Sequence, residues 1–341
     1  MAKSSRKYDW EGLSDDALLR MRVRDLKIQI RGSLIEPHVD RLYQELDDKG
    51  IHVQPPCYLA DEWLTPDKMP IIGIPFCLAH PRLKQLEQKM MYEVEGNTEK
   101  ACMKLLRHEC GHALNYAYQL YRRTRWRALF GPFSTTYSNS YYYKPYSRRF
   151  VINLEDNYAQ SHPDEDFAET FAVWLSPDSR WEVKYQGWPV IKKLRYVDTV
   201  MKDIAAEAPR ITQKGHPPYS AARMTSTLVA HYERKRRMLG SEFQGFYDDS
   251  LRALFATRQP NNSEARASKL LRSHRVRLAQ NVTRWTGHRK YDIYQLIDRL
   301  AGRCDDLHLV ANPEVEENII GLTALLTAIA SNTLTVSRKR R

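Results

Sequence analysis

The stretch from Leu106 to Leu114, which reads LRHECGHAL, constrains the fold more than any other part of the chain. Its two histidines, His108 and His112, are four residues apart. On an α-helix this spacing is about one turn, so both imidazoles would project from the same face. The surrounding apolar residues recur at the spacing of a helix with one buried face; they are Cys102, Leu105, Leu106, Ala113, Ala117 and Leu120. We therefore predict a helix over residues 98–122, with the histidine pair at the edge of its apolar stripe, beside a cleft.

A glutamate directly follows the first histidine and completes the pattern H-E-x-x-H. On a helix this pattern is typical of two zinc-binding imidazoles with the glutamate as general base. Zinc lowers the pKa of a bound water towards neutrality, and Glu109 would lie near enough to take its proton without being a ligand. We therefore predict Zn²⁺ as the cofactor, His108 and His112 as ligands and Glu109 as the catalytic base. Because a catalytic zinc has three protein ligands and one open position, a third ligand is expected elsewhere.

The glycine inside this motif, Gly111, is unfavourable for a helix by about 1 kcal/mol relative to alanine. A residue without a side chain at this position would let a neighbouring backbone or a substrate approach closely. We expect such an approach beside the histidine pair.

A second predicted helix, Asp164–Leu175, offers the third ligand. Its glutamates Glu165 and Glu169 are four residues apart and share one face. This spacing suits a pair in which one carboxylate binds zinc and the other accepts a hydrogen bond from the far ring nitrogen of a histidine ligand. Either glutamate can be the ligand on this reasoning. His162 is a further candidate, although Pro163 after it favours a helix entry that points its ring away from the histidine pair.

Residues 108–112 and 164–175 together resemble the gluzincins, zinc peptidases that use two histidines and a glutamate as ligands. They are most similar to a bacterial family described as "putative zinc-binding metallopeptidase", whose second motif reads much like Glu-Asp-Phe-Ala-Glu-Thr-Phe-Ala. The catalytic domain of anthrax lethal factor has a similar arrangement. The resemblance covers roughly residues 98–178. It implies a zincin-like fold and a metallopeptidase that hydrolyses peptide bonds of a protein or peptide substrate.

The resemblance also implies roles for individual residues. Glu165 is then the third zinc ligand, and Glu169 is the hydrogen-bond partner of His108. In the lethal-factor pattern a tyrosine seven residues before the ligand glutamate stabilises the tetrahedral intermediate, and that position is Tyr158 here. The 52 residues between His112 and Glu165 exceed the short connection of thermolysin-like enzymes. The tyrosine-rich loop Phe133–Tyr146 inside this connection has no counterpart in the resemblance.

The length of 341 residues fits two domains, and helical spacing dominates the chain. The predicted fold class is mainly α (α+β), a zincin-like core with a small β-sheet edge followed by a helical C-terminal region. We assign residues 1–215 to the catalytic domain with its N-terminal helices and residues 216–341 to the basic helical region. The turn-rich segment Pro209–Ser220 marks the boundary.

Two segments are predicted to form strands. The first, Met69–Phe76, is β-prone but carries two prolines, which are confined to the edges of sheets, so we expect an edge strand or an irregular hairpin. The second, Arg149–Asn153, reads as a short strand. We expect an extended substrate to lie along the sheet edge.

The positive charge of the chain is concentrated towards its C-terminus. The net charge is +12, and residues 201–341 carry 24 basic and 14 acidic side chains. Such a region can contact nucleic acid or another polyanion, or can be a solvated surface. The alternative to the peptidase is therefore a nucleic-acid-associated protein with a structural or degenerate zinc site, although the sequence contains no base-reading motif. A zinc hydrolase for a non-peptide amide would share the peptidase chemistry and remains open.

The sequence predicts a cytoplasmic protein without a membrane partner. It contains no run of about 18 apolar residues and no apolar segment after its basic N-terminus that would indicate a secretory signal. The five cysteines are scattered and form no C-x-x-C pair, as expected for reduced thiols.

Overall fold

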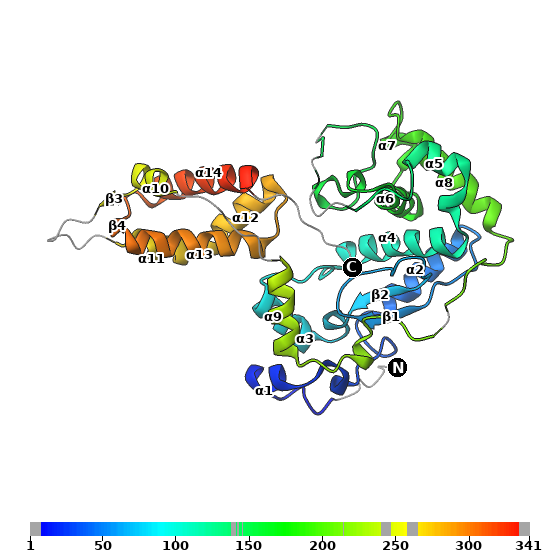
Figure 1. Ribbon diagram of the computed structural model, residues 1–341, viewed down its shortest axis with the longest axis horizontal. Helices are drawn as coiled ribbons and strands as arrows, with labels where there is room; N and C mark the ends of the chain where they lie inside the picture. The colour runs from blue at the N-terminus through cyan, green and yellow to red at the C-terminus, as the bar shows by residue number, and fades with distance from the viewer. Residues whose placement is uncertain are drawn as a thin grey trace. The chain divides into compact units, whose positions relative to one another are not determined.

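The structure is a computed structural model (Figure 1), and it describes residues 8–137, 141, 143–144, 146–213, 215–239, 247–257 and 265–333. The chain forms two compact units, the first ending at Arg234 and the second beginning at Lys235. Helices make up most of both units, and the first also contains a two-stranded parallel sheet. The predicted fold class, mainly α with a small β-sheet edge, is confirmed. The predicted domain division between residues 215 and 216 stays a prediction.

The first unit carries both predicted motifs. Its helices and strands are, in chain order, α1 (Asp15–Arg20), α2 (Glu36–Asp48), β1 (Cys57–Ala60), β2 (Ile72–Pro75), α3 (Pro81–Met91), α4 (Glu99–Ala117), α5 (Thr124–Phe130), α6 (Pro163–Leu175), α7 (Trp181–Lys184), α8 (Ile191–Ile204) and α9 (Leu228–Leu239), within which the unit ends. Short 3₁₀ helices lie between them: η1 (Val23–Leu26), η2 (Phe76–Ala79), η3 (Leu120–Arg122), η4 (Glu155–Gln160) and η5 (Ala221–Arg223).

The small sheet pairs β1 with β2 in parallel, in a register that runs from Cys57–Ile72 to Ala60–Pro75. The predicted strand segment Met69–Phe76 therefore contains β2. Pro75 is the last residue of this strand, a position at which the missing N–H interrupts no further ladder.

The helix that carries the histidine motif is α4. It begins after Thr98, whose side chain accepts a hydrogen bond from the Ala101 N–H at 3.2 Å and so caps the helix. It ends at Ala117, earlier than the predicted Arg122, because Gln119 adopts a left-handed backbone with φ of 54°.

The acidic helix α6 begins at Pro163, one residue before the predicted start at Asp164. The His162 side chain caps its N-terminus by accepting a hydrogen bond from the Asp164 N–H at 3.1 Å. Pro163 occupies the first helical position, where an N–H would have no partner within the helix. The first turn carries Asp164, Glu165 and Asp166, and the positive end of the helix dipole stabilises such acids.

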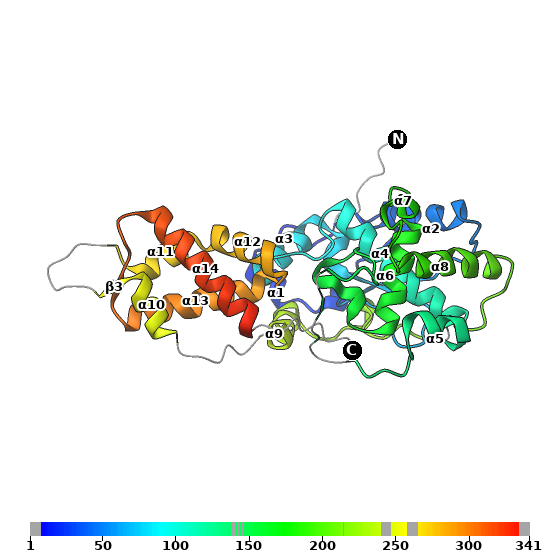
Figure 2. The same ribbon diagram turned by 90° about the horizontal axis from the view of Figure 1, so that it is seen from above.

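The helices α4 and α6 pack against each other in both views of the molecule (Figures 1 and 2). Gly111 makes this contact close, since a Cβ there would lie 3.0 Å from the Ala168 Cα and 3.1 Å from the Phe171 Cβ. The close approach expected at Gly111 is therefore that of the α6 backbone. It brings the histidine-bearing face of α4 within reach of the acids of α6.

The segment Arg149–Asn153 is not a strand, so this prediction is wrong. The Ile152 N–H donates to the Tyr185 hydroxyl at 3.0 Å, and Lys104 donates to the Asn153 carbonyl at 2.6 Å. Side chains from other elements thus satisfy backbone groups that a neighbouring strand would otherwise pair.

The second unit is a helical bundle with a short two-stranded ladder. Its elements are α10 (Asp248–Leu254), β3 (Ala256–Thr257), α11 (Ala267–Ser273), α12 (Arg275–Thr286), α13 (Lys290–Asp306), β4 (Leu309–Val310) and α14 (Val315–Thr333). β3 and β4 pair antiparallel. Across the described parts of both units, no helix combines the length and the apolar character needed to cross a bilayer.

Candidate metal centre

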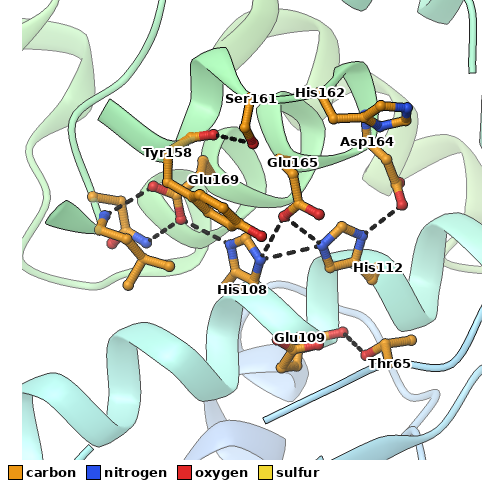
Figure 3. A network of polar contacts seen from close by, with 12 residues as sticks. Thr65, His108, Glu109, His112, Tyr158, Ser161, His162, Asp164, Glu165 and Glu169 are labelled. Atoms are coloured by element: carbon orange, nitrogen blue, oxygen red, sulfur yellow. Dashed lines mark hydrogen bonds and ion pairs between the residues drawn. The ribbon is translucent and has the colours of Figure 1, made fainter. Parts of the chain in front are cut away.

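One nitrogen from each motif histidine and one oxygen of Glu165 converge between α4 and α6 (Figure 3). His108 Nε2 lies 3.1 Å and His112 Nε2 lies 3.2 Å from Glu165 Oε2, and the two nitrogens are 3.2 Å apart. All three residues are buried, with exposed fractions of 2%, 0% and 0%. Their ligand atoms are placed closely enough to hold one metal ion.

The spacing of these three atoms suits a small tetrahedral cation. Zinc binds imidazole nitrogen and carboxylate oxygen at about 2.0–2.1 Å, which separates neighbouring tetrahedral ligand atoms by about 3.3 Å. The observed separations of 3.1 to 3.2 Å are close to this value. Three acceptor atoms facing one another in a buried space are unfavourable unless a proton or a cation lies between them. The residues present therefore fit a zinc ion.

Glu169, the other glutamate of the pair, does not reach the converging atoms. Its Oε1 lies 2.8 Å from His108 Nδ1 and also accepts a hydrogen bond from Asn153 Nδ2 at 2.8 Å. Its Oε2 accepts the Leu154 N–H at 2.8 Å. The geometry thus puts Glu165 among the possible ligand atoms and Glu169 on the far ring nitrogen of His108.

Asp164 provides the corresponding contact for the second histidine, and sequence reasoning missed it. Its Oδ2 lies 3.0 Å from His112 Nδ1 and accepts the Tyr116 hydroxyl at 2.6 Å, while its Oδ1 accepts Asn115 Nδ2 at 2.8 Å. The available signal was its place directly before Glu165 in the first turn of α6. A carboxylate at Nδ1 holds the proton there and leaves the Nε2 lone pair for a metal.

His162, the competing ligand candidate, is not among the converging atoms. Its Nδ1 accepts the Asp164 N–H, so its proton is on Nε2, which donates to the Thr135 carbonyl at 2.7 Å. Both ring nitrogens are therefore engaged in holding the start of α6.

Tyr158 lies in η4, and its ring centroid is 5.7 Å from that of His108. The side chain is buried, and Figure 3 shows it beside His108 on the side of the α6 acids. The structure therefore places the Tyr158 ring beside the imidazole of His108, and its role with an oxyanion stays a prediction.

Glu109 is buried on α4, directly after His108. Its main-chain carbonyl accepts a hydrogen bond from the Thr65 hydroxyl at 3.0 Å (Figure 3). Thr65 precedes β2, so this bond ties the motif to the segment beside the sheet. All six residues singled out from the sequence therefore lie in one region of the first unit; they are His108, Glu109, His112, Tyr158, Glu165 and Glu169.

The surrounding carboxylates favour positive charge at this site. Burial lowers the pKa of His108, but hydrogen bonds and charge from Glu165 and Glu169 outweigh burial and raise the pKa to about 10. Without a metal, the site would hold a proton on this ring. A bound cation would take over the neutralising role and release that proton.

Two buried ion pairs fix the outer faces of the helix pair. Arg107 of α4 makes two bonds of 2.6 Å to the Glu45 carboxylate of α2. Lys193 of α8 lies 2.5 Å from Asp166 Oδ2 on α6. Burial raises the pKa of Asp166 to about 7 although Lys193 opposes the shift. Each motif helix is thus held to a different neighbour.

Comparison with known protein families gives a match to part of the chain. Residues 86–200, which include α4 and α6, match the model of a family described as "Putative zinc-binding metallo-peptidase". No curated protein and no solved structure matches the chain. The resemblance to this family stated from the two motifs is therefore supported, and the stretch matched contains every predicted site residue.

Proposed function

We propose that the protein is a zinc-dependent metallopeptidase of the gluzincin type, similar to the catalytic domain of anthrax lethal factor. The observation that carries the proposal is the convergence of His108 Nε2, His112 Nε2 and Glu165 Oε2 within 3.2 Å of one another. The family match supports zinc binding and peptidase activity, since its description names both.

In this proposal the two histidines and Glu165 hold the ion. A bound zinc supplies a Lewis acid that makes a water acidic near neutral pH and polarises the scissile carbonyl. Glu109 takes the proton of the attacking water and later delivers it to the leaving amine. The Tyr158 hydroxyl donates a hydrogen bond to the oxygen on which negative charge develops.

The carboxylates that contact the Nδ1 atoms of the two histidines determine the protonation state of the imidazole rings in this mechanism. Glu169 and Asp164 hold a proton on each Nδ1, so both Nε2 atoms face the ion as neutral donors. The two acids also keep the rings in fixed orientations, which preserves the ligand geometry through turnover.

The remaining functional expectations are also proposals. We propose residues 1–215 as the catalytic domain, residues 216–341 as a basic helical region that can contact a polyanion such as nucleic acid, and a cytoplasmic location. A nucleic-acid-associated protein with a structural or degenerate zinc site is the alternative. It predicts no hydrolysis of any peptide, with zinc bound if the site is structural and absent if the site is degenerate.

The test combines metal content with turnover on a peptide library read by mass spectrometry. We expect about one zinc per chain. His108→Ala and Glu165→Ala should each lose zinc and turnover together. Glu109→Gln should keep zinc and lose turnover by at least about 100-fold, because general acid–base catalysis contributes 10²–10⁴-fold. Glu182→Gln, at an exposed glutamate of α7, is the matched control and should change neither.

Stoichiometric zinc in both ligand variants would overturn the assignment of the site. The wild-type chain could instead bind zinc and hydrolyse a non-peptide amide but no peptide. That result would support the zinc site and show that the proposed substrate class is wrong.

A further inference from the structure

Among the described residues of the tyrosine-rich loop, Tyr137 brings its hydroxyl group to the candidate metal centre. Tyr137, between α5 and η4, donates a hydrogen bond at 3.0 Å to Glu165 Oε1. This is the carboxylate oxygen that does not converge with the histidines, since His108 Nε2 and His112 Nε2 both lie nearest to Oε2. The same hydroxyl lies 3.4 Å from Asp164 Oδ2. Tyr137 therefore contacts the outer oxygen of the proposed ligand.

The residue that caps the N-terminus of α6, His162, holds the ring of Tyr137 and so positions this hydroxyl. The Tyr137 ring stacks on His162 with a centroid distance of 3.6 Å and an interplanar angle of 15°. His162 in turn caps α6 through Asp164 and binds the carbonyl of Thr135, two residues before the tyrosine. Tyr137 is nevertheless 40% exposed, so its contact with a fully buried carboxylate is not explained by burial of the ring.

A carboxylate can bind a metal through one oxygen or through both. Two bonds from Glu165, added to two imidazoles, occupy the four positions of a tetrahedral ion, so a water could then bind only as a fifth ligand. A hydrogen bond to Oε1 stabilises negative charge on that oxygen and holds it away from the ion. It therefore favours binding through Oε2 alone.

We propose that Tyr137 is a positioning residue that restricts Glu165 to a single metal bond and thereby keeps the fourth coordination position open for water. This inference rests on the proposed zinc peptidase function. It also gives a role to part of the loop between the two motifs, for which the sequence resemblance offers none.

The test is Tyr137→Phe in the full chain, loaded with Co²⁺ in place of zinc. Cobalt reports its coordination number through its visible absorption, which is more intense for four-coordinate than for five-coordinate sites. We expect a four-coordinate spectrum for the wild type and a weaker, five-coordinate-like spectrum for the variant. With zinc, we expect kcat to fall about 10-fold and KM to stay unchanged, within the range for losing an outer contact of a metal ligand. Tyr146→Phe, at a 96% exposed tyrosine of the same loop, should match the wild type in both measurements.

The possible outcomes distinguish a failure of the Tyr137 inference from a failure of the proposed zinc peptidase function. If the wild type binds neither cobalt nor zinc, the proposed function fails. If the wild type binds and turns over but Tyr137→Phe keeps its spectrum and kcat, only the role of Tyr137 is overturned. A folded variant that loses metal altogether, judged by circular dichroism and metal content, also overturns it, because retention of Glu165 as a ligand is part of the proposal.

Discussion

At the scale of single residues, the site depends on two carboxylates that contact the Nδ1 atoms of the histidines, on the ring side away from the converging Nε2 atoms. Glu169 and Asp164 lie 2.8 and 3.0 Å from the Nδ1 atoms of His108 and His112. Both acids are almost fully buried, and side-chain amides or hydroxyls donate to them. Their negative charge makes each imidazole a better donor to a cation, while their geometry fixes the proton on the far nitrogen.

This arrangement predicts the effect of removing charge while keeping shape. Asp164→Asn and Glu169→Gln should each still fold and keep an oxygen beside the histidine Nδ1, but zinc affinity should fall by about 10–100-fold. Competition with a chromophoric chelator measures the affinity. Asp178→Asn, at an exposed acid after α6, should bind zinc like the wild type. If both buried variants bind zinc as tightly as the wild type, the negative charges of Asp164 and Glu169 do not contribute to zinc affinity.

The residues that the sequence predicts are those with a periodic signal. Glu165 and Glu169 are recognisable because four-residue spacing puts them on one face of a helix. Asp164 and Tyr137 have no such signal, because their contacts depend on how α6 is rotated against α4 and on where a loop returns. Choosing Glu165 rather than Glu169 for the converging atoms likewise requires the helix positions, which the sequence does not specify.

At the scale of elements, the contact of α4 with α6 depends on the absence of one side chain. A Cβ at Gly111 would meet the Ala168 Cα at 3.0 Å and the Phe171 side chain at 3.1 Å. The first of these is backbone and cannot turn aside as a flexible side chain would. The helix pair must therefore separate if the position is filled.

Gly111→Ala should consequently destabilise the first unit in spite of better helix propensity. The gain in propensity is about 1 kcal/mol, whereas overpacking a closed core costs about 1–3 kcal/mol. We expect a lower melting temperature and weaker zinc binding, measured by calorimetry with and without the metal. Gly302→Ala in α13 is the control, because nothing lies within 4 Å of the added Cβ. A variant at Gly111 with wild-type zinc affinity would contradict the close-contact argument.

The elements themselves were predictable where their signals are local. Thr98 caps α4, and His162 with Pro163 starts α6, so both helix beginnings can be read from the sequence. The strand predicted for Arg149–Asn153 failed because its backbone bonds to side chains that are distant in sequence, such as Tyr185. Local composition is β-prone there, and only tertiary contacts decide against a strand.

At the scale of the whole molecule, several basic side chains of the second unit form ion pairs with acids of the same unit. Arg272, Arg275 and Arg277 of its helical bundle each lie within 3.2 Å of an acidic side chain; the acids are Asp305, Asp298 and Glu316. These three guanidinium groups are therefore partly engaged within the unit, while the excess of 24 basic over 14 acidic side chains after residue 200 already includes their partners. Contact with nucleic acid stays a prediction.

The second unit also contains a histidine that links the connection between α12 and α13 to the helix α14. His288 lies between α12 and α13, and its Nε2 is 3.1 Å from the Ala330 carbonyl of α14. Burial lowers the pKa of His288 below the ordinary 6.5, and the carbonyl only partly offsets the effect. The folded unit therefore prefers the neutral ring.

This preference gives the attachment of α14 a defined pH dependence. The neutral ring contributes its full stability above pH 6.5, the value in the unfolded chain, and the contribution is lost as the pH falls through the lower folded pKa. Between these two values the unfolded chain binds the proton more readily, so acid favours opening of α14. We expect hydrogen exchange in α14, corrected for intrinsic rates, to accelerate from pH 7.5 to pH 5. His288→Gln retains a donor for the Ala330 carbonyl but cannot titrate, so its corrected exchange should change less over this range. Equal acceleration in the variant and the wild type would mean that other groups control the acid sensitivity of this helix.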